Sequence, residues 1–189
     1  MVGNPDTSSR LRLADIEALL QNIADPEIPV LSIGDLGILR SVQWAADAAG
    51  AELLEVVITP TYSACPAIEQ IAQDIIGLLN VHGIAGKVRL QLAPAWSSDW
   101  LSAPARERLR AWGIAPPAQS MPQTVRFVRA ARAPSGDTVQ HPASQGIAVP
   151  CPRCQSLDTT QTSYFGSTNC KALYRCRNCL EPFDYFKPY

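Results

Sequence analysis

The sequence lacks the usual features of membrane, secreted and nucleic-acid-binding proteins. Its 189 residues contain no apolar run near the ~18–20 residues of a membrane-spanning helix, and the N-terminus has no signal-peptide pattern. The net charge of −1 gives no general attraction to nucleic acid or to an acidic membrane. We therefore expect a soluble, cytoplasmic protein without a membrane partner.

Common catalytic signatures are also missing. The chain has no P-loop, no GxGxxG and no HExxH motif. The sequence therefore gives no motif evidence for a nucleotide-binding protein, a dinucleotide-binding protein or a zinc peptidase. Histidine occurs only twice, and neither His82 nor His141 has a sequence neighbour that would complete a triad. An enzyme with a cysteine nucleophile stays open as an alternative, although the sequence offers it no obvious base.

The composition is that of a chain able to bury a core, with 47% hydrophobic and 17% charged residues. Apolar periodicity predicts a helix, two strands, a helix and a strand, at Leu13–Ile23, Ile38–Trp44, Leu53–Thr59, the residues after Cys65, and Lys87–Leu92. A further helix is expected at Ala103–Trp112, with Ser102 as its N-cap. This order predicts an α+β fold, a small two-layer sandwich with helices on one face of a sheet.

Changes in composition divide the chain into three parts. We predict an α+β domain at 13–115 and a metal module at 149–189. Residues 116–148 are rich in Pro, Ala, Ser, Gly and Gln, which is typical of a linker, and QTVRFVR at 123–129 is compatible with one short strand.

Five of the six cysteines lie in the last module, and four of them form two CxxC pairs. Cys151 and Cys154 are separated from Cys176 and Cys179 by 21 residues. This spacing is typical of a tetrahedral four-thiolate site. A module of about 40 residues buries too little surface to fold alone, so a bound metal would supply much of its stability. Zinc is the first interpretation, and rubredoxin-like iron or an Fe–S cluster is the alternative.

We expect the module to be a zinc ribbon built on a hairpin. Its strands are predicted at Tyr164–Gly166, Ala172–Arg175 and Phe183–Phe186. Five basic residues stand against three acidic ones over 151–189, an excess too small to predict a nucleic-acid partner.

Cys65 stands alone in the front half, between a predicted strand and Pro66, a residue suited to the first turn of a helix. Unpaired N–H groups at a helix N-terminus favour an anion, so this position favours a reactive, metal-binding thiolate. The other interpretation is a small buried hydrophobe.

Two further features accompany this thiol. Asp25 and Glu27 lie on a proline-framed segment, Asp25–Pro29, which we call the acidic loop. Its carboxylates are either solvated or close to Cys65, where they would assist metal or thiol chemistry. Cys170 is the odd cysteine of the ribbon, and three interpretations stay open: a free thiol at the hairpin tip, an exchangeable ligand that handles metal near the ribbon, or an inert packed side chain.

Several segments resemble a known family. The Asp25-Pro26-Glu27 segment, the Asp35-Leu36-Gly37 turn and the run from Thr59 to Pro66 resemble iron–sulfur assembly domains of the SufT type. PAW at 94–96, LRAWGIAP at 109–116, CPRC at 151–154 and FGSTNCKALYRC at 165–176 are similar to the PaaD family, also called PaaJ. That family comprises accessory subunits of the bacterial phenylacetyl-CoA ring-epoxidase system, and the resemblance covers residues 13–189.

The resemblance implies a non-catalytic maturation role in aerobic phenylacetate degradation. The protein would help to install or repair an Fe–S cluster or iron centre in an epoxidase subunit, with the Fe–S reductase as the expected client. Cys65 would be the functional thiol that holds iron or a cluster transiently, and Asp25 and Glu27 would be its assisting acidic loop. A second protomer, giving a homodimer, or the client would complete the coordination. Cys151, Cys154, Cys176 and Cys179 would hold a structural zinc. The alternative role is a structural adaptor that docks through its ribbon.

Overall fold

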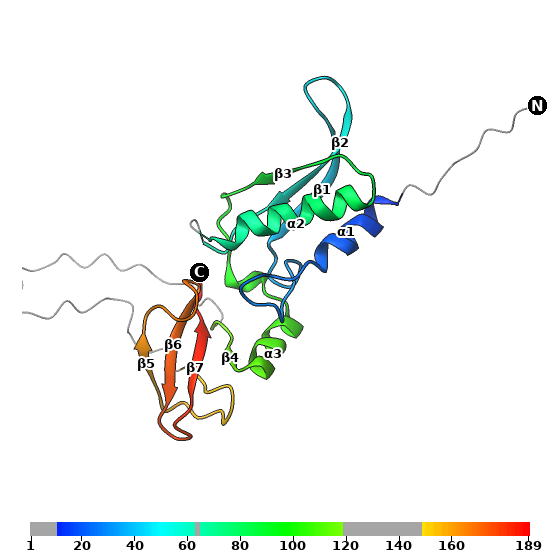
Figure 1. The fold of residues 1–189 in the computed structure, drawn as a ribbon. Helices are drawn as coiled ribbons and strands as arrows, with labels where there is room; N and C mark the ends of the chain where they lie inside the picture. Colours follow the sequence, from blue (N-terminus) through cyan, green and yellow to red (C-terminus); the bar gives the residue numbers. More distant parts are fainter. Residues whose placement is uncertain (1–10, 63–64, 119–148) are drawn as a thin grey trace, which may run out of the picture.

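The computed structural model describes residues 11–62, 65–118 and 149–189 and shows three α-helices and two small sheets (Figure 1). The predicted strand at 123–129 and residues 119–148 of the predicted linker lie outside the described residues. The elements are α1 (Leu13–Gln21), β1 (Leu39–Ala46), β2 (Glu52–Ile58), α2 (Ala67–Val81), β3 (Gly86–Leu90), the 3₁₀ turn η1 (Ser98–Trp100), α3 (Ala103–Trp112), β4 (Ile114–Ala115), β5 (Thr159–Ser163), β6 (Lys171–Cys176) and β7 (Pro182–Phe186).

The first sheet has the strand order β1-β2-β3. β1 and β2 are antiparallel, whereas β2 and β3 are parallel and are connected through α2, as a parallel pair requires a crossover. Helices α1 and α2 lie together on one face of this sheet (Figure 1). The predicted order of elements and the two-layer α+β fold are confirmed.

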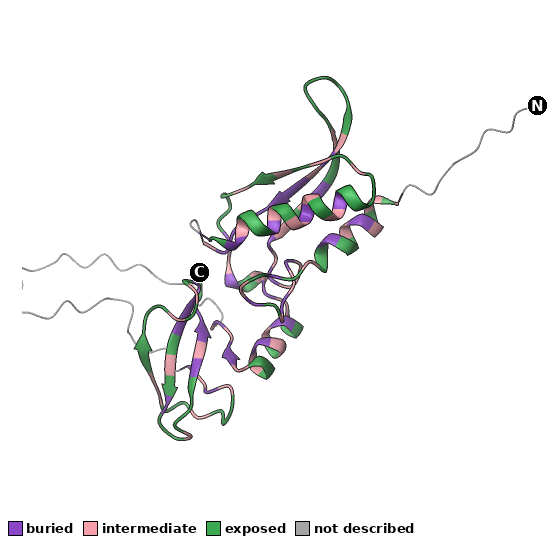
Figure 2. Ribbon diagram, in the orientation of Figure 1, coloured by how far each residue is buried: buried purple, intermediate pink, exposed green. Residues whose placement is uncertain are grey.

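One face of α2 provides much of the core. Ile71, Ile75 and Leu79 recur every four residues and are fully buried against the sheet, whereas the opposite face is exposed (Figure 2). Gly86 permits this contact, because a Cβ atom there would lie 2.3 Å from the Leu79 Cδ1 atom. The side-chain periodicity read from the sequence therefore sets how α2 lies on β3.

The second sheet contains the ribbon, in the order β4-β7-β6-β5. β6 and β7 occupy their predicted positions, but the prediction of a strand at Tyr164–Gly166 is wrong. The first strand of the hairpin is Thr159–Ser163, a polar edge strand without the apolar alternation that marks a strand in a sequence. Residues 164–169 instead form the turn, closed by a hydrogen bond from the Gly166 N–H to the Lys171 carbonyl at 2.8 Å.

Strand β4 connects the front part of the chain to the ribbon. It follows directly on α3, which ends at Gly113 in the left-handed conformation (φ 88°) that favours glycine at a helix end. Ile114 and Ala115 then pair in parallel with Asp184 and Tyr185 of β7. A two-residue strand leaves no pattern in a sequence, so this connection was not predicted.

Of the two buried hydrophobic clusters among the described residues, one spans both parts of the chain, and the other lies within the ribbon and β4. Phe186 and Cys170 of the ribbon belong to the same buried cluster as the core residues of α1, α2 and the first sheet. Trp96 lies at this boundary, 6.0 Å from the Phe186 ring between ring centres, and its indole N–H donates to the Leu36 carbonyl at 2.7 Å. The contact sets which end of the ribbon faces α2.

Candidate functional site

Cys65 lies at the entrance to α2, as the sequence predicts. If Pro66 were the first helical residue, Cys65 would be the N-cap, but in the structure Cys65 lies one position before the N-cap. Pro66 is the N-cap and the helix begins at Ala67. The Ala67 backbone N–H and the Thr61 side chain act on the Cys65 sulfur and lower the pKa of its thiol, against the larger effect of burial. The residue is 9% exposed, so it lies at the edge of the core.

Of the two interpretations of Cys65, its surroundings favour the buried, protonated thiol over the thiolate. Burial raises the pKa of the Cys65 thiol above its ordinary value, and the charges of Glu27 and Asp25 raise it further. The hydrogen bond from Ala67 lowers the pKa, but by less than burial raises it. Cys65 is therefore protonated at neutral pH unless a cation replaces the proton.

The structure places the acidic loop close to Cys65, and its two carboxylates have different environments. Asp25 is buried, and its Oδ1 atom accepts the backbone N–H groups of Glu27 and Ile28 at 2.9 and 2.8 Å. Burial raises the pKa of Asp25, against these hydrogen bonds and the charge of Lys171. Asp25 thus holds the loop in shape, which leaves Glu27 as the carboxylate that can meet a ligand.

Glu27 is half-buried and faces the ribbon. Its Oε2 atom lies 3.8 Å from the sulfur of Cys170. Burial and the neighbouring Asp25 raise the pKa of Glu27, whereas Cys170 and Lys171 lower it. This carboxylate therefore reaches across the boundary between the two parts of the chain.

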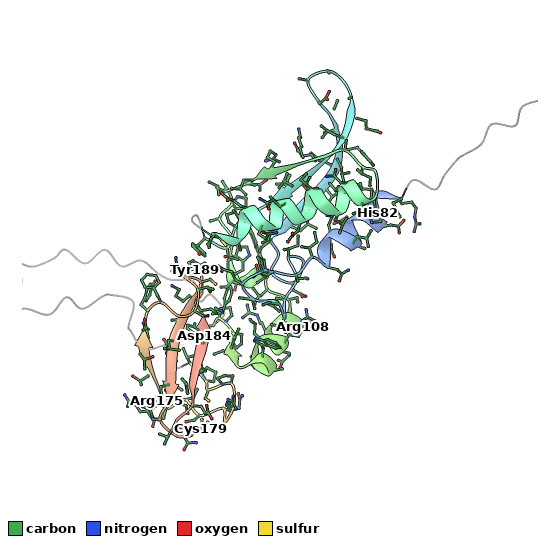
Figure 3. The ribbon with its side chains drawn as sticks, viewed as in Figure 1. His82, Arg108, Arg175, Cys179, Asp184 and Tyr189 are labelled. Carbon is green, nitrogen blue, oxygen red and sulfur yellow. The ribbon has the colours of Figure 1, made fainter. Side chains whose placement is uncertain are left out.

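Cys170 belongs to the same buried cluster as Cys65, at the opposite end of β6 from the four paired cysteines, so it is too far from their site to be one of its ligands, and a role in handling metal stays a prediction. It precedes β6, whereas Cys176 ends that strand, which puts about 20 Å between them at ~3.3 Å per residue. Figure 3 shows the same separation, with Tyr189 at the end near α2 and Cys179 at the far end of the ribbon. Burial raises the pKa of Cys170 to about 11, and its sulfur lies 2.9 Å from the Thr168 hydroxyl.

Aromatic side chains cover this boundary. Tyr62 stacks on Tyr189 with ring centres 6.1 Å apart, and Tyr189 meets the edge of Trp96 at 6.3 Å. The Ser98 backbone N–H donates to the Tyr189 carbonyl at 3.2 Å, so the last residue of the chain is held over the site. Burial raises the pKa of Tyr189 to about 12, which keeps this hydroxyl uncharged.

The four cysteines of the CxxC pairs converge at the other end of the ribbon. Their sulfur atoms all lie within 4.8 Å of one another. Cys151 and Cys179 are 3.7 Å apart at sulfur, and Cys154 and Cys176 are 3.5 Å apart. A tetrahedral zinc with Zn–S bonds of about 2.3 Å requires S···S separations of about 3.8 Å, so the group fits a structural zinc.

The surroundings of this group also suit bound thiolates. The Cys176 sulfur accepts the Cys179 backbone N–H at 3.4 Å. Hydrogen bonding, first of all from the Ser156 backbone, lowers the pKa of Cys154 to about 6, whereas the neighbouring thiols raise the pKa of Cys179 to about 12, so the first thiolate of the group forms at Cys154. Cys151 and Cys176 are buried, whereas Cys154 is exposed, so the ion would lie near the surface, at the end of the ribbon far from α2.

The sequence did not predict the meeting of Cys65 with Cys170, nor the part that Lys171 and Tyr189 play beside them. No spacing rule connects residues more than a hundred positions apart. His82 caps the C-terminal end of α2, at the opposite end of that helix from Cys65, and His141 lies outside the described residues. None of the helices in the described ranges has the length and apolar character needed to cross a lipid bilayer.

Comparison with known proteins gives two family matches that divide the chain. Residues 13–91 match the family described as iron-sulfur cluster assembly protein, and residues 135–187 match the PaaD zinc beta ribbon domain. Among solved structures, the chain is similar to a domain of unknown function from Bacillus anthracis, at 28% identity over 51% of this chain and 90% of that chain, with a TM-score of 0.43. A Mycobacterium tuberculosis protein described as associated with Fe–S complex assembly and repair is 25% identical over 59% of this chain and 96% of its own, with a TM-score of 0.34.

A curated relative matches almost the whole chain. The putative 1,2-phenylacetyl-CoA epoxidase D subunit of Escherichia coli (strain K12) is 45% identical over 174 residues, which are 92% of this chain and 91% of the relative. An iron–sulfur assembly domain and a PaaD-type ribbon occur in the same order in which the structure shows an α+β domain and a four-cysteine ribbon. The chain therefore belongs to the PaaD family, that of the phenylacetyl-CoA epoxidase D subunit.

Proposed function

We propose that this protein is a maturation factor for a phenylacetyl-CoA epoxidase and assists assembly of an Fe–S cluster or iron centre in a partner protein, with the Fe–S reductase as client. It is not itself the catalyst. The 45% identity to an epoxidase D subunit supports a role in the epoxidase system, and the match of residues 13–91 to iron–sulfur assembly proteins supports a role in cluster assembly. Its six unpaired cysteines suit the reducing cytoplasm.

The observation that carries this proposal is the position of Cys65. It lies at a helix entrance, beside Glu27, at the boundary where the ribbon packs on the assembly domain. A carrier must bind its cargo and release it, so a thiol whose protonated form is stable without metal suits a transient ligand. The ribbon, with a structural zinc on its four cysteines, would hold this boundary in shape.

The test is reconstitution of the apo-reductase with iron and sulfide, in the presence and absence of the protein. Cys65→Ser should reduce the initial rate of cluster formation to the rate without the protein, because the transient ligand is lost. Val81→Ser is the matched control, since Val81 lies at the other end of the same helix and is 84% exposed. Maturation by Cys65→Ser at the wild-type rate would exclude this role for the thiol.

A structural adaptor is the second candidate. The aromatic side chains Tyr164 and Phe165 are 52% and 58% exposed on the ribbon, where a partner could contact them. An adaptor predicts that Cys65→Ala changes no assay, whereas replacing Cys151 and Cys154 together abolishes co-purification with the epoxidase subunits. Cluster formation rates and co-purification, measured on the same variants, separate the two roles.

A further inference from the structure

Two thiols from distant parts of the sequence meet where the ribbon packs on α2. Cys65 and Cys170 are 9% and 3% exposed and belong to one buried cluster. They are close enough for Cys65 to raise the pKa of Cys170. The Glu27 carboxylate lies 3.8 Å from the Cys170 sulfur. The two thiols and the Glu27 carboxylate are therefore gathered at the boundary between the ribbon and the assembly domain.

Two buried hydroxyl oxygens nearby have no hydrogen-bond partner among the described residues: Tyr62 Oη and Thr59 Oγ1. Thr59 is 1% exposed and lies in the segment that leads from β2 to Cys65. Burial, together with the charges of Cys65, Glu27 and Cys170, raises the pKa of Tyr62 to about 12, and the Tyr62 ring stacks on Tyr189 at the same boundary. Buried hydroxyls normally have partners, so these two indicate a ligand or its water.

The charges at this place also favour a divalent cation. The two carboxylates of the acidic loop and the two thiols face two ammonium groups, those of Lys171 and Lys187. If both thiols are ionised, and Asp184, 3.8 Å from the Lys171 ammonium group, is counted with them, five negative charges and two positive charges leave a net charge of −3. The tyrosines that line the boundary, Tyr62 and Tyr189, are uncharged. One dication would therefore offset most of this negative charge.

We propose that Cys65, Cys170 and Glu27 form a second metal site, the junction site, which binds one thiophilic divalent cation of the Fe²⁺, Co²⁺ and Zn²⁺ class. The proposal deepens the maturation role, with which it shares Cys65, by naming the ligands and the ion. Among the described residues, only the ribbon cysteines have three or more ligand atoms all within 4.8 Å of one another. Ion binding would thus draw the junction ligands together and pull the end of the ribbon that carries Cys170 onto α2.

The ligand set defines the chemistry of this site. Two thiolates select iron, cobalt or zinc over Mg²⁺ and Ca²⁺, which prefer oxygen ligands. Three protein ligands leave a fourth position open, where the client's thiolate or a sulfide can bind. Both thiols must lose a proton to the solvent when the ion binds, so two protons are released per ion.

The experiment is an anaerobic titration of the full chain, first loaded with one zinc at the ribbon, with Co²⁺. We expect one further ion per chain, with sulfur-to-cobalt charge-transfer absorption and no release of the ribbon zinc. The apparent dissociation constant should fall about a hundredfold between pH 7 and pH 8, because two protons leave with each ion bound. Failure of the wild-type protein to bind a second ion, or release of one zinc for each cobalt bound, would overturn the proposal.

Variants identify the ligands. Cys65→Ser and Cys170→Ser should each remove about half of the charge-transfer absorption and weaken binding by about tenfold or more, and Glu27→Gln should weaken binding while preserving the absorption. Unchanged cobalt binding by Cys170→Ser would exclude the ribbon thiol as a ligand. The cobalt titration does not depend on the client, so a wild-type protein that binds Co²⁺ yet fails to mature the reductase would reject the proposed function and retain this site.

Discussion

Replacing Phe186 by alanine tests the contact between the ribbon and the assembly domain. Phe186 is 1% exposed, and its ring lies 6.0 Å from that of Trp96 between ring centres. Phe→Ala substitutions in a core cost about 3–5 kcal/mol, because apolar burial is lost and a cavity remains. With a urea m-value of about 2 kcal/mol per molar, a loss of about 4 kcal/mol lowers the unfolding midpoint by about 2 M.

The assay is urea unfolding of the zinc-loaded protein, followed by tryptophan fluorescence. Phe165→Ala is the matched control, because Phe165 is in the same ribbon but is 58% exposed. It contacts solvent, the Tyr164 ring and the Lys187 ammonium group, so its loss should cost less than about 1 kcal/mol.

A second measurement links this contact to the site. If the ribbon covers Cys65 and Cys170, Phe186→Ala should speed iodoacetamide labelling of both thiols, whereas bound zinc protects the ribbon cysteines. The labelled residues can be identified by peptide mass spectrometry. Equal effects of Phe186→Ala and Phe165→Ala on the midpoint and on labelling would refute the view that one buried cluster spans the two parts.

Two further predictions concern protons and metal. The pKa of Cys170 rises from its ordinary value of 9.0 to about 11 in the folded chain, which therefore binds this proton more tightly than the unfolded chain does. The stability that this proton contributes is fully present below pH 9, and about 2–3 kcal/mol of it is lost as pH rises towards 11. Cys170→Ala should therefore weaken the alkaline loss of stability, measured by urea unfolding under reducing conditions. A fall that is equally steep in Cys170→Ala and in the wild type would contradict this assignment. Removal of zinc with a strong chelator should open the ribbon, because structural zinc supplies about 10–16 kcal/mol of apparent binding free energy in small modules. Hydrogen exchange should then show loss of protection in β5 and β6 and retention in β2, and protected ribbon amides in the zinc-free protein would show that the ribbon folds without metal.

The sequence alone determined the elements that depend on local patterns. The four-residue spacing of Ile71, Ile75 and Leu79 predicted α2 and its buried face, and Ser102 predicted the start of α3, where its side chain accepts the Ala105 N–H. The CxxC spacing predicted the four-sulfur cluster, because two tight turns on one hairpin bring four sulfurs together without help from the rest of the chain.

Only the tertiary structure decided what depends on long-range packing. Strand β4 has two residues and exists through its pairing with β7, and the polar strand β5 exists through its pairing with β6. The sequence left the proton affinity of Cys65 open, because burial and two carboxylates outweigh the helix N-terminus, and neither is visible in the local sequence. Cys170 meets Glu27 and Cys65 because Phe186 and Trp96 fix the ribbon against the assembly domain, and such packing between distant residues leaves no periodic signal in a single chain.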